Sequence, residues 1–366
     1  MLLIKAKNIN IKLYLSLIFN LLIFFLSSCS ESTKPLDNNG PDTTSHNFTW
    51  TIDTIGTGAT ALRDVSIINE NDIWVVGEIY LDGEQDSYNA IHWNGDKWEL
   101  HHIPAVTSYG TISKMGINAV YAFNENNIWM FSYAGSYVHW NGYEWKSEFL
   151  YERKGSIYKI WGSTSKNLYF VGSHGNITHF DGTNWNLIES DTDIPIQDIW
   201  GARTGDCSYE VLCVASEKFH YRGIKVIRIN DNQAEHLDTL GLSSSLSGIW
   251  FSKTGSLSNL NNITDKYFIT GAGLYSTDSV QNKWKEVDEI PAVYSEAVRG
   301  NHINDVFVVG HFGLLAHWNG STWFYTTGNS DIYYRVAVKG DIVVVIGSIV
   351  NGILSGPGKI LRGKRY

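Results

Sequence analysis

Short stretches of alternating apolar and polar residues fill the chain from residue 47 to its end, and Gly, Asn, Asp and Ser separate them. Alternation with a period of two is typical of β-strands that bury one face. After residue 30 no stretch of useful length has the period of an amphipathic helix. The pattern therefore predicts an all-β fold.

One unit of four strands repeats through this region. Its clearest copies contain a segment like HWNGxxW and end at Trp98, Trp145, Trp185 and Trp323, and weaker copies begin at Glu210, Asp265 and Asp341. A further apolar strand precedes each copy, beginning near Arg63, Ile117, Tyr158, Gln197, Ser247, Glu296 and Arg335. Four strands over about 40 to 50 residues have the size of a propeller blade. The repeat predicts a seven-bladed β-propeller of four-stranded blades over residues 47–366; because the copy at Glu210 is irregular, six and eight blades stay open as alternatives.

The two ends of this region predict how the ring closes. The last copy lacks its outermost strand, and residues 47–52 ahead of the first complete copy have the pattern of that strand. We expect it to pair with residues 359–362, which would remove both open edges of the array.

The N-terminus has the pattern of a secretory signal. Lys5, Lys7 and Lys12 precede an apolar stretch from Leu13 to Leu26, which is shorter than the roughly 20 residues of a spanning helix. Residues 26–29, Leu-Ser-Ser-Cys, resemble the bacterial lipobox, which implies cleavage after residue 28 and a lipid on Cys29. An ordinary secretory signal with a coincidental cysteine is the alternative.

The resulting prediction divides the chain into a signal peptide at 1–28, a lipidated cysteine with a polar, flexible tether at 29–46, and the propeller at 47–366. The lipid would hold the protein on a membrane of the bacterial cell envelope. Ser30 is not an acidic retention residue, which favours the outer membrane.

Composition narrows the function classes. The formal charge is -9, whereas a nucleic-acid partner requires a basic surface. Three cysteines exclude a disulfide scaffold. The 14 tryptophans could indicate sugar binding, but every one falls on a repeated strand position, which favours packing between blades.

Residues that recur in several blades are best explained by packing. His92, His139, His179 and His317 occupy one repeated position, so we interpret them as structural, hydrogen-bonded histidines and not as a metal site. The pairs Asn94-Gly95, Asn141-Gly142, Asp181-Gly182 and Asn319-Gly320 predict type I′ turns between the third and fourth strands.

The repeat resembles the broad superfamily of WD-repeat, YVTN and BNR-like propellers, and its Asp-Gly-x-x-Trp version is similar to the Asp-box of sialidases with one residue missing. The resemblance covers about residues 47–366 and implies architecture only, because propellers serve many functions. It implies no cofactor.

Function is expected where the blades differ, at the mouth of the central channel. The candidate binding residues on this face and on the innermost strands are Arg63, Tyr158, Lys159, His174, His220, Arg222, His311 and Arg335. They predict a binding or assembly module for a protein or a surface glycan.

An enzyme is the competing interpretation. Asp64, Asp198 and Glu296 from separate blades could act as an acid and base pair in a glycoside hydrolase or lyase. The simpler expectation is that Arg63, Lys159 and Arg335 neutralise these carboxylates.

Two of the cysteines lie close together in the irregular blade. Cys207 and Cys213 could form a disulfide in an exported protein, or Cys213 could pack at the apolar position that Val75 holds in the first blade.

Overall fold

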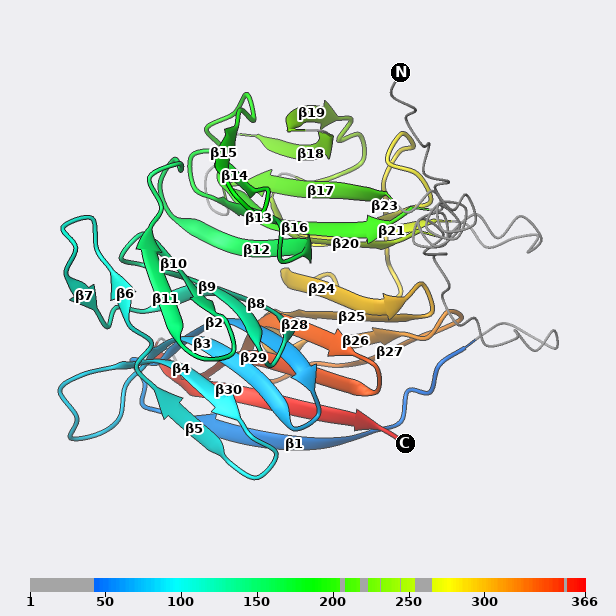
Figure 1. Ribbon diagram of the computed structural model, residues 1–366. Coiled ribbons are helices and arrows are strands. Elements are labelled where there is room, and N and C mark those ends of the chain that lie inside the picture. Colours follow the sequence, from blue (N-terminus) through cyan, green and yellow to red (C-terminus); the bar gives the residue numbers. More distant parts are fainter. Residues whose placement is uncertain are drawn as a thin grey trace, which may run out of the picture. The chain divides into compact units, whose positions relative to one another are not determined.

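The computed structural model describes residues 43–204, 208–217, 223–230, 232–243, 245–253, 265–351 and 354–366 of the 366-residue chain. All of them belong to a unit that spans Pro41–Tyr366. Within them, seven four-stranded antiparallel sheets are arranged as the blades of a propeller (Figure 1). The predicted all-β, seven-bladed fold is confirmed.

The first three blades follow one another along the chain, each with its innermost strand first. Blade 1 has β2 (Ala61–Asn69), β3 (Asp72–Ile79), β4 (Tyr88–Trp93) and β5 (Trp98–His101). Blade 2 has β8 (Ile117–Asn124), β9 (Asn127–Ser132), β10 (Ser136–Trp140) and β11 (Trp145–Phe149). Blade 3 has β12 (Ile157–Thr164), β13 (Asn167–Gly172), β14 (Ile177–Phe180) and β15 (Trp185–Ile188).

The next three blades repeat this order. Blade 4 has β16 (Ile196–Arg203), β17 (Tyr209–Ser216), β18 (Ile224–Asn230) and β19 (Gln233–Leu237). Blade 5 has β20 (Leu246–Ser252), β21 (Lys266–Gly271), β22 (Gly273–Thr277) and β23 (Lys285–Glu286). Blade 6 has β24 (Ser295–His302), β25 (Asp305–Gly310), β26 (Leu315–Trp318) and β27 (Trp323–Thr326), with a 3-10 turn η1 (His311–Gly313) between β25 and β26.

Blade 7 joins the two ends of the propeller. Its inner strands are β28 (Ile332–Lys339), β29 (Ile342–Asn351) and β30 (Leu354–Arg365), and its outermost strand is β1 (Phe48–Ile55). Phe48 is opposite Arg365 and Ile52 is opposite Leu361 in an antiparallel register. The predicted closure by an N-terminal strand is therefore confirmed.

A short hairpin departs from the repeat. β6 (Ala105–Val106) and β7 (Ile112–Ser113) form it in the connection from blade 1 to blade 2. Val106 donates its N–H to Ser147 Oγ of β11 at 2.9 Å, and its carbonyl accepts a hydrogen bond from Ser136 of β10. The hairpin is thus attached to the outer part of blade 2.

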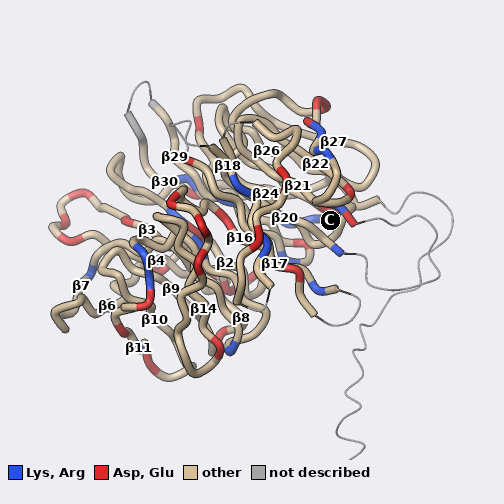
Figure 2. The backbone as a smooth tube through the Cα atoms, turned by 90° about the horizontal axis from the view of Figure 1, so that it is seen from above, with Lys and Arg blue, Asp and Glu red and all other residues tan. Residues whose placement is uncertain are grey.

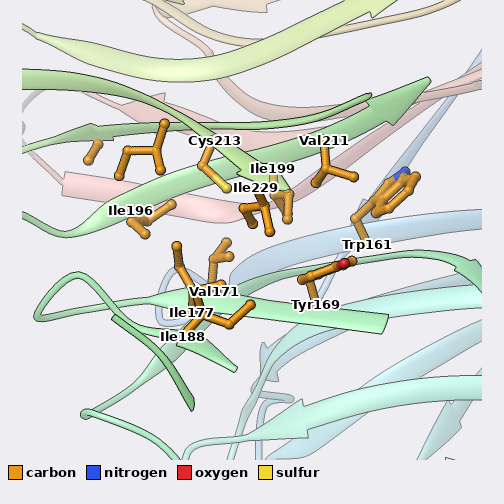
Figure 3. Close-up of a cluster of buried hydrophobic side chains, with 12 residues drawn as sticks. Trp161, Tyr169, Val171, Ile177, Ile188, Ile196, Ile199, Val211, Cys213 and Ile229 are labelled. Atoms are coloured by element: carbon orange, nitrogen blue, oxygen red, sulfur yellow. The ribbon is translucent and has the colours of Figure 1, made fainter. Parts of the chain in front are cut away.

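Buried side chains fill each space between neighbouring blades. The cluster between blades 3 and 4 joins Trp161 and Tyr169 on one side to Ile199, Val211 and Cys213 on the other (Figure 3). Corresponding clusters occupy the other six interfaces, including the one between blades 7 and 1. The hydrophobic core is therefore a closed ring of interfaces and not one central core.

The tryptophans belong to these interfaces, as predicted. None of the 14 is exposed, and several meet an aromatic ring of the next blade. Trp74 contacts Trp145 at a centroid distance of 5.7 Å, and Trp200 contacts Trp250 at 6.5 Å. Large rings suit the widening gap between twisted sheets.

Cys213 is a free cysteine in the buried cluster, opposite Ile199 in the register, just as Val75 is opposite Val65. This is the packed alternative of the two that the sequence left open, and burial raises the pKa of its thiol well above the usual value. Its proposed disulfide partner, Cys207, lies outside the described residues.

The turns between third and fourth strands correct one expectation. Trp93 is opposite Trp98, so four residues form the loop, and only Gly95 has positive φ, at 95°. Asn94 Oδ1 instead accepts the backbone N–H groups of Asp96 and Lys97, each at 3.0 Å. The prediction of a type I′ turn was wrong because the Asn side chain, by closing an Asx turn, organises a longer loop.

The four repeated histidines are hydrogen-bonded, as predicted. Rings of His92, His139, His179 and His317 stack on the aromatic residue opposite at centroid distances of 4.3, 4.1, 4.4 and 4.3 Å. Each Nε2 bonds the Asp or Asn that begins the second strand, at 2.8, 2.9, 2.7 and 3.0 Å. They connect the second and third strands of their blades.

Among the described residues, no helix has the length and apolar character needed to cross a membrane.

Candidate functional site at the channel mouth

A β-bulge near the start of each innermost strand builds the channel mouth. In every blade one residue of this strand has no partner in the register of the second strand, and its neighbours on both sides do. These residues are Arg63, Asn118, Tyr158, Gln197, Ser247, Glu296 and Tyr334. A bulge redirects a side chain away from the regular alternation. The fold therefore repeats one such position in every blade, near the start of the innermost strand.

Four consecutive bulge residues line a pocket of about 350 Å³. Its full lining is Arg63, Asn118, Tyr133, Ser156, Tyr158, Gln197 and Arg335. Every one of these side chains has a polar group, and none is acidic. The pocket is thus suited to a polar ligand with acceptor groups.

Two arginines give the pocket its charge. Arg63 Nε donates to Tyr133 Oη at 2.8 Å, and Arg335 Nη1 donates to the carbonyl of Tyr334 at 2.9 Å. Neither guanidinium forms an ion pair with a carboxylate in the described part of the chain; the acidic residues of the channel pair elsewhere. Burial raises the pKa of Tyr133 although the charge of Arg63 opposes this, so its phenol remains a neutral hydrogen-bonding group.

A layer of buried ion pairs lies next to the pocket along the same strands. Asp64 directly follows Arg63, is fully buried, and bonds Lys159 of blade 3 and the N–H of Val120 in blade 2, the latter at 3.1 Å. Asp198 directly follows Gln197 and receives both Nη atoms of Arg299, at 2.8 and 2.7 Å. Two negative and two positive charges therefore balance inside the channel wall.

The titration of these groups follows from their pairing. Burial acts to raise the pKa of Asp198, but the charge and hydrogen bonds of Arg299, helped by Lys159, hold that pKa below its usual range. Burial lowers the pKa of Lys159, and the charge of Asp64 opposes the effect. The pKa of Arg299 is raised despite its burial, because Asp198 stabilises the charged form.

A second cavity borders this layer of ion pairs. It has a volume of about 240 Å³ and is lined by later residues of the innermost strands, among them Val65, Ile199 and Trp200, together with Lys159 and Arg299. Lys159, predicted at the mouth, thus belongs to the buried layer and this inner cavity. It is 9% exposed.

The proposed acid and base residues are not open to the pocket. Asp64, Asp198 and Glu296 are 0%, 4% and 5% exposed, and each has a partner: Lys159, Arg299 and His311, the last at 3.1 Å. The expectation that Arg63 and Arg335 neutralise these carboxylates was wrong, whereas the same expectation for Lys159 is confirmed by its pair with Asp64. Pairing with Asp198 falls to Arg299, which comes from the middle of β24 and reaches across two blade interfaces.

The remaining predicted binding residues are dispersed. His174 is exposed in the connection between β13 and β14, with φ at 56°, and His311 lies in η1 against Glu296. Neither lines the pocket. His220 and Arg222 lie outside the described residues.

Sequence reasoning missed Tyr133 and Arg299. Arg299 follows an apolar residue and precedes Gly300 inside a strand. A charged residue within this otherwise buried strand was the only sequence feature that could have pointed to Arg299. Tyr133 lies in the connection between β9 and β10, whose approach to Arg63 depends on neighbouring blades.

Charge elsewhere on the described chain is mixed. Figure 2 shows basic and acidic residues interspersed along the blades, without a continuous basic stripe. The channel mouth differs from this background because Arg63 and Arg335 form no ion pair with a carboxylate in the described part of the chain.

Comparison with known proteins gives structural neighbours only. No family model matches the chain, and no curated protein matches it. A solved structure of YCF48 bound to a D1 peptide is similar, with a TM-score of 0.60 and 18% identity over 89% of this chain and 100% of that one. YCF48 from Cyanidioschyzon merolae has a TM-score of 0.57 and 15% identity, covering 86% and 98% of the two chains. The computationally designed protein Ika8 has a TM-score of 0.54 and 10% identity, covering 84% and 98%. At these identities the likeness establishes the propeller fold and leaves the function to the site.

Proposed function

We propose that this protein is an exported, lipid-anchored binding module whose channel mouth holds an acidic segment of a protein partner. The proposal rests on one observation: Arg63 and Arg335 line a concave polar pocket with no carboxylate partner among the described residues. Such guanidinium groups recognise carboxylates through paired, charge-assisted hydrogen bonds.

The surrounding groups define what the pocket accepts. Tyr158, Asn118 and Gln197 supply hydrogen-bonding groups around the two charges. The balanced ion pairs of Asp64 and Asp198 lie next to the pocket along the same strands. A carboxylate from an Asp, a Glu or a chain terminus would satisfy both arginines at the mouth.

Exposed apolar residues on the same face favour a protein as the source of that carboxylate. Tyr109 and Ile112 of the β6–β7 hairpin are 92% and 74% exposed, and Tyr151 and Phe312 lie in the connections after β11 and β25. Exposed apolar groups around a polar pocket are typical of protein-binding surfaces. The similar YCF48 structure is bound to a peptide, which agrees with this choice.

An enzyme has less support. A glycoside hydrolase needs two carboxylates facing its substrate, whereas Asp64, Asp198 and Glu296 are buried and paired.

The anchor and location are part of the proposal and concern residues 1–46, most of which lie outside the described part. Cys29 would carry the lipid, and the tether would connect it to the propeller beside β1. A protein held in this way on the outer membrane of a bacterial envelope could recruit its partner at the membrane surface.

The experiment compares acidic and neutral ligands. Purified protein is titrated by fluorescence anisotropy with labelled peptides that carry Asp or Glu, a free C-terminal carboxylate, or neither, and is also applied to a glycan array. We expect acidic peptides to bind and a double variant, Arg63→Gln with Arg335→Gln, to bind them at least about tenfold more weakly, because each charge-assisted hydrogen bond contributes about 1.5–3 kcal/mol.

Arg203→Gln is the matched control, since Arg203 is an exposed arginine at the opposite end of an innermost strand. Acidic-peptide binding that survives the double variant, or equal binding of neutral peptides, would refute the proposed site. Selective binding of a glycan would favour the glycan alternative.

A further inference from the structure

Three potential metal ligands meet on the outer strands of blade 1. One donor atom each from His92, Glu99 and His101 lies within 4.8 Å of the others. The register explains the meeting: His92 of β4 is opposite Glu99 of β5, and His101 is two residues further on the same face of β5. Imidazole nitrogen and carboxylate oxygen are ligands that Zn²⁺ prefers.

The hydrogen bonds leave the two histidines ready to bind a cation. Nε2 of His92 donates to Asp72 Oδ1 at 2.8 Å, which places the lone pair of the neutral ring on Nδ1. Nε2 of His101 is a buried atom with no hydrogen-bond partner among the described residues, an arrangement that costs free energy unless a ligand satisfies the atom.

Asp72 corresponds to a known supporting element of metal centres. A carboxylate that accepts a hydrogen bond from the second nitrogen of a ligating histidine orients the ring and strengthens it as a ligand. On the other side, Glu99 accepts a hydrogen bond from Asn94 Nδ2 at 2.8 Å and lies 3.7 Å from Lys97 Nζ. Both the histidine and the carboxylate are therefore held in place from outside the cluster.

The other blades show that this cluster is not a by-product of the repeat. The structural histidine recurs in blades 2, 3 and 6, but the position of Glu99 is occupied there by Lys146, Asn186 and Phe324. The position of His101 is occupied by Glu148, Ile188 and Thr326. Among these four blades only blade 1 combines three potential ligands on one face, and packing alone does not require this combination.

We propose that His92, Glu99 and His101 bind one divalent transition-metal ion of the Zn²⁺ type. Tetrahedral zinc with bonds of about 2.0–2.2 Å needs its ligand atoms roughly 3.5 Å apart. Small rotations bring these partly exposed side chains to that separation; His92 and Glu99 are 21% and 39% exposed in their side chains. The ion joins β4 to β5, and its fourth position is open to water. The site is independent of the channel mouth.

The test measures zinc binding by isothermal titration calorimetry. The purified full chain is first stripped of metal with EDTA, the EDTA is removed, and the protein is titrated with ZnCl₂. We expect the unaltered protein to bind one ion at this site, and His101→Ala and Glu99→Gln each to weaken that binding at least about tenfold. Asp72→Asn should weaken it by about 10-fold to 100-fold without loss of the fold, because blades 2 and 3 have Asn127 and Asn167 at this position.

His139→Ala is the matched control, because His139 has the same stacking and the same hydrogen bond in blade 2 but lacks the two other ligands. It should bind zinc as the unaltered protein does. Co²⁺ should give the visible absorption of tetrahedral coordination in the unaltered protein. Glu99→Gln should abolish this absorption and preserve folding, because it changes a partly exposed side chain. The proposal would be overturned if the unaltered protein did not bind Zn²⁺, or if His101→Ala and Glu99→Gln bound it as tightly as the unaltered protein.

Discussion

At the scale of single residues, the channel wall owes its character to charges that are buried and matched. Arg299 binds both oxygens of Asp198 and lies over the ring of Trp200, 5.1 Å from its centroid. Removing one member of a buried pair leaves an uncompensated charge, which is more costly than the pair itself is stabilising. Arg63 and Arg335 lack such partners, and this difference separates binding groups from structural ones.

Arg299→Met tests this distinction. The substitution should lower the free energy of unfolding at neutral pH by about 3–5 kcal/mol, measured by urea denaturation. Lys114→Met is the control, because its ion pair with Asp86 is exposed and contributes only about 0–1 kcal/mol.

The free energy of unfolding should depend on pH differently in the unaltered protein and in Arg299→Met. In the unaltered protein the pKa of Asp198 is depressed, so its contribution is present above the unfolded pKa of about 3.9 and is lost as the pH falls through the folded value. Without Arg299, burial favours the protonated form, and the deficit of the variant should shrink as the pH falls towards 4. A deficit that stays constant down to acid pH would contradict this account.

At the scale of elements, the bulges and the closing strand determine the site and the ring. A bulge recurs near the start of all seven innermost strands, and four of the bulge residues line the pocket. Strand β1 covers the edge that β30 would otherwise expose. Closure depends on close packing where β1 pairs with β30. A Cβ atom on Gly363 would lie 2.7 Å from the ring of Trp50, its register partner.

Gly363→Ala should therefore weaken the pairing of β1 with β30. We expect a loss of about 1–3 kcal/mol from overpacking, measured as a lower melting temperature. In a Trp50→Leu background the same change should cost clearly less, because the smaller side chain leaves space for the methyl group. Equal losses in both backgrounds would show that the contact with Trp50 is not the cause.

At the scale of the whole molecule, the propeller is held by seven interfaces of similar composition and has no open end in its ring. Because the closed ring needs no partner to complete its sheets, its mouth and its outer faces are available for ligands. The proposed lipid on Cys29 would add a membrane attachment to this rigid body.

Cys29→Ala tests the attachment. The variant should lose incorporation of an alkyne-labelled fatty acid and should leave the membrane fraction, because the lipid chains would be its anchor. Ser30→Ala is the control and should remain labelled and membrane-bound. A Cys29→Ala protein that stays in the membrane fraction as firmly as the unaltered one would exclude the anchor.

The sequence by itself determined the blade architecture and the closing strand, because strand alternation and a repeated motif are local patterns that every copy reinforces. It favoured seven blades, and the structure excluded the alternatives of six and eight. It also identified Arg63, Tyr158 and Arg335 as residues of the channel mouth, since they begin the innermost strands. The packing function of Trp74, Trp145 and the other tryptophans followed from the same repetition.

Only the tertiary structure decided which charges pair and which remain available. Arg299 reaches Asp198 across two blade interfaces. Glu99 and His101 meet His92 through the register of β4 and β5. Such meetings depend on the direction of side chains in the closed ring, and alternation along one strand does not contain that information. For this reason the architecture was predictable from the sequence, whereas the pairing of Arg299 with Asp198 and the lack of a carboxylate partner for Arg63 among the described residues were not.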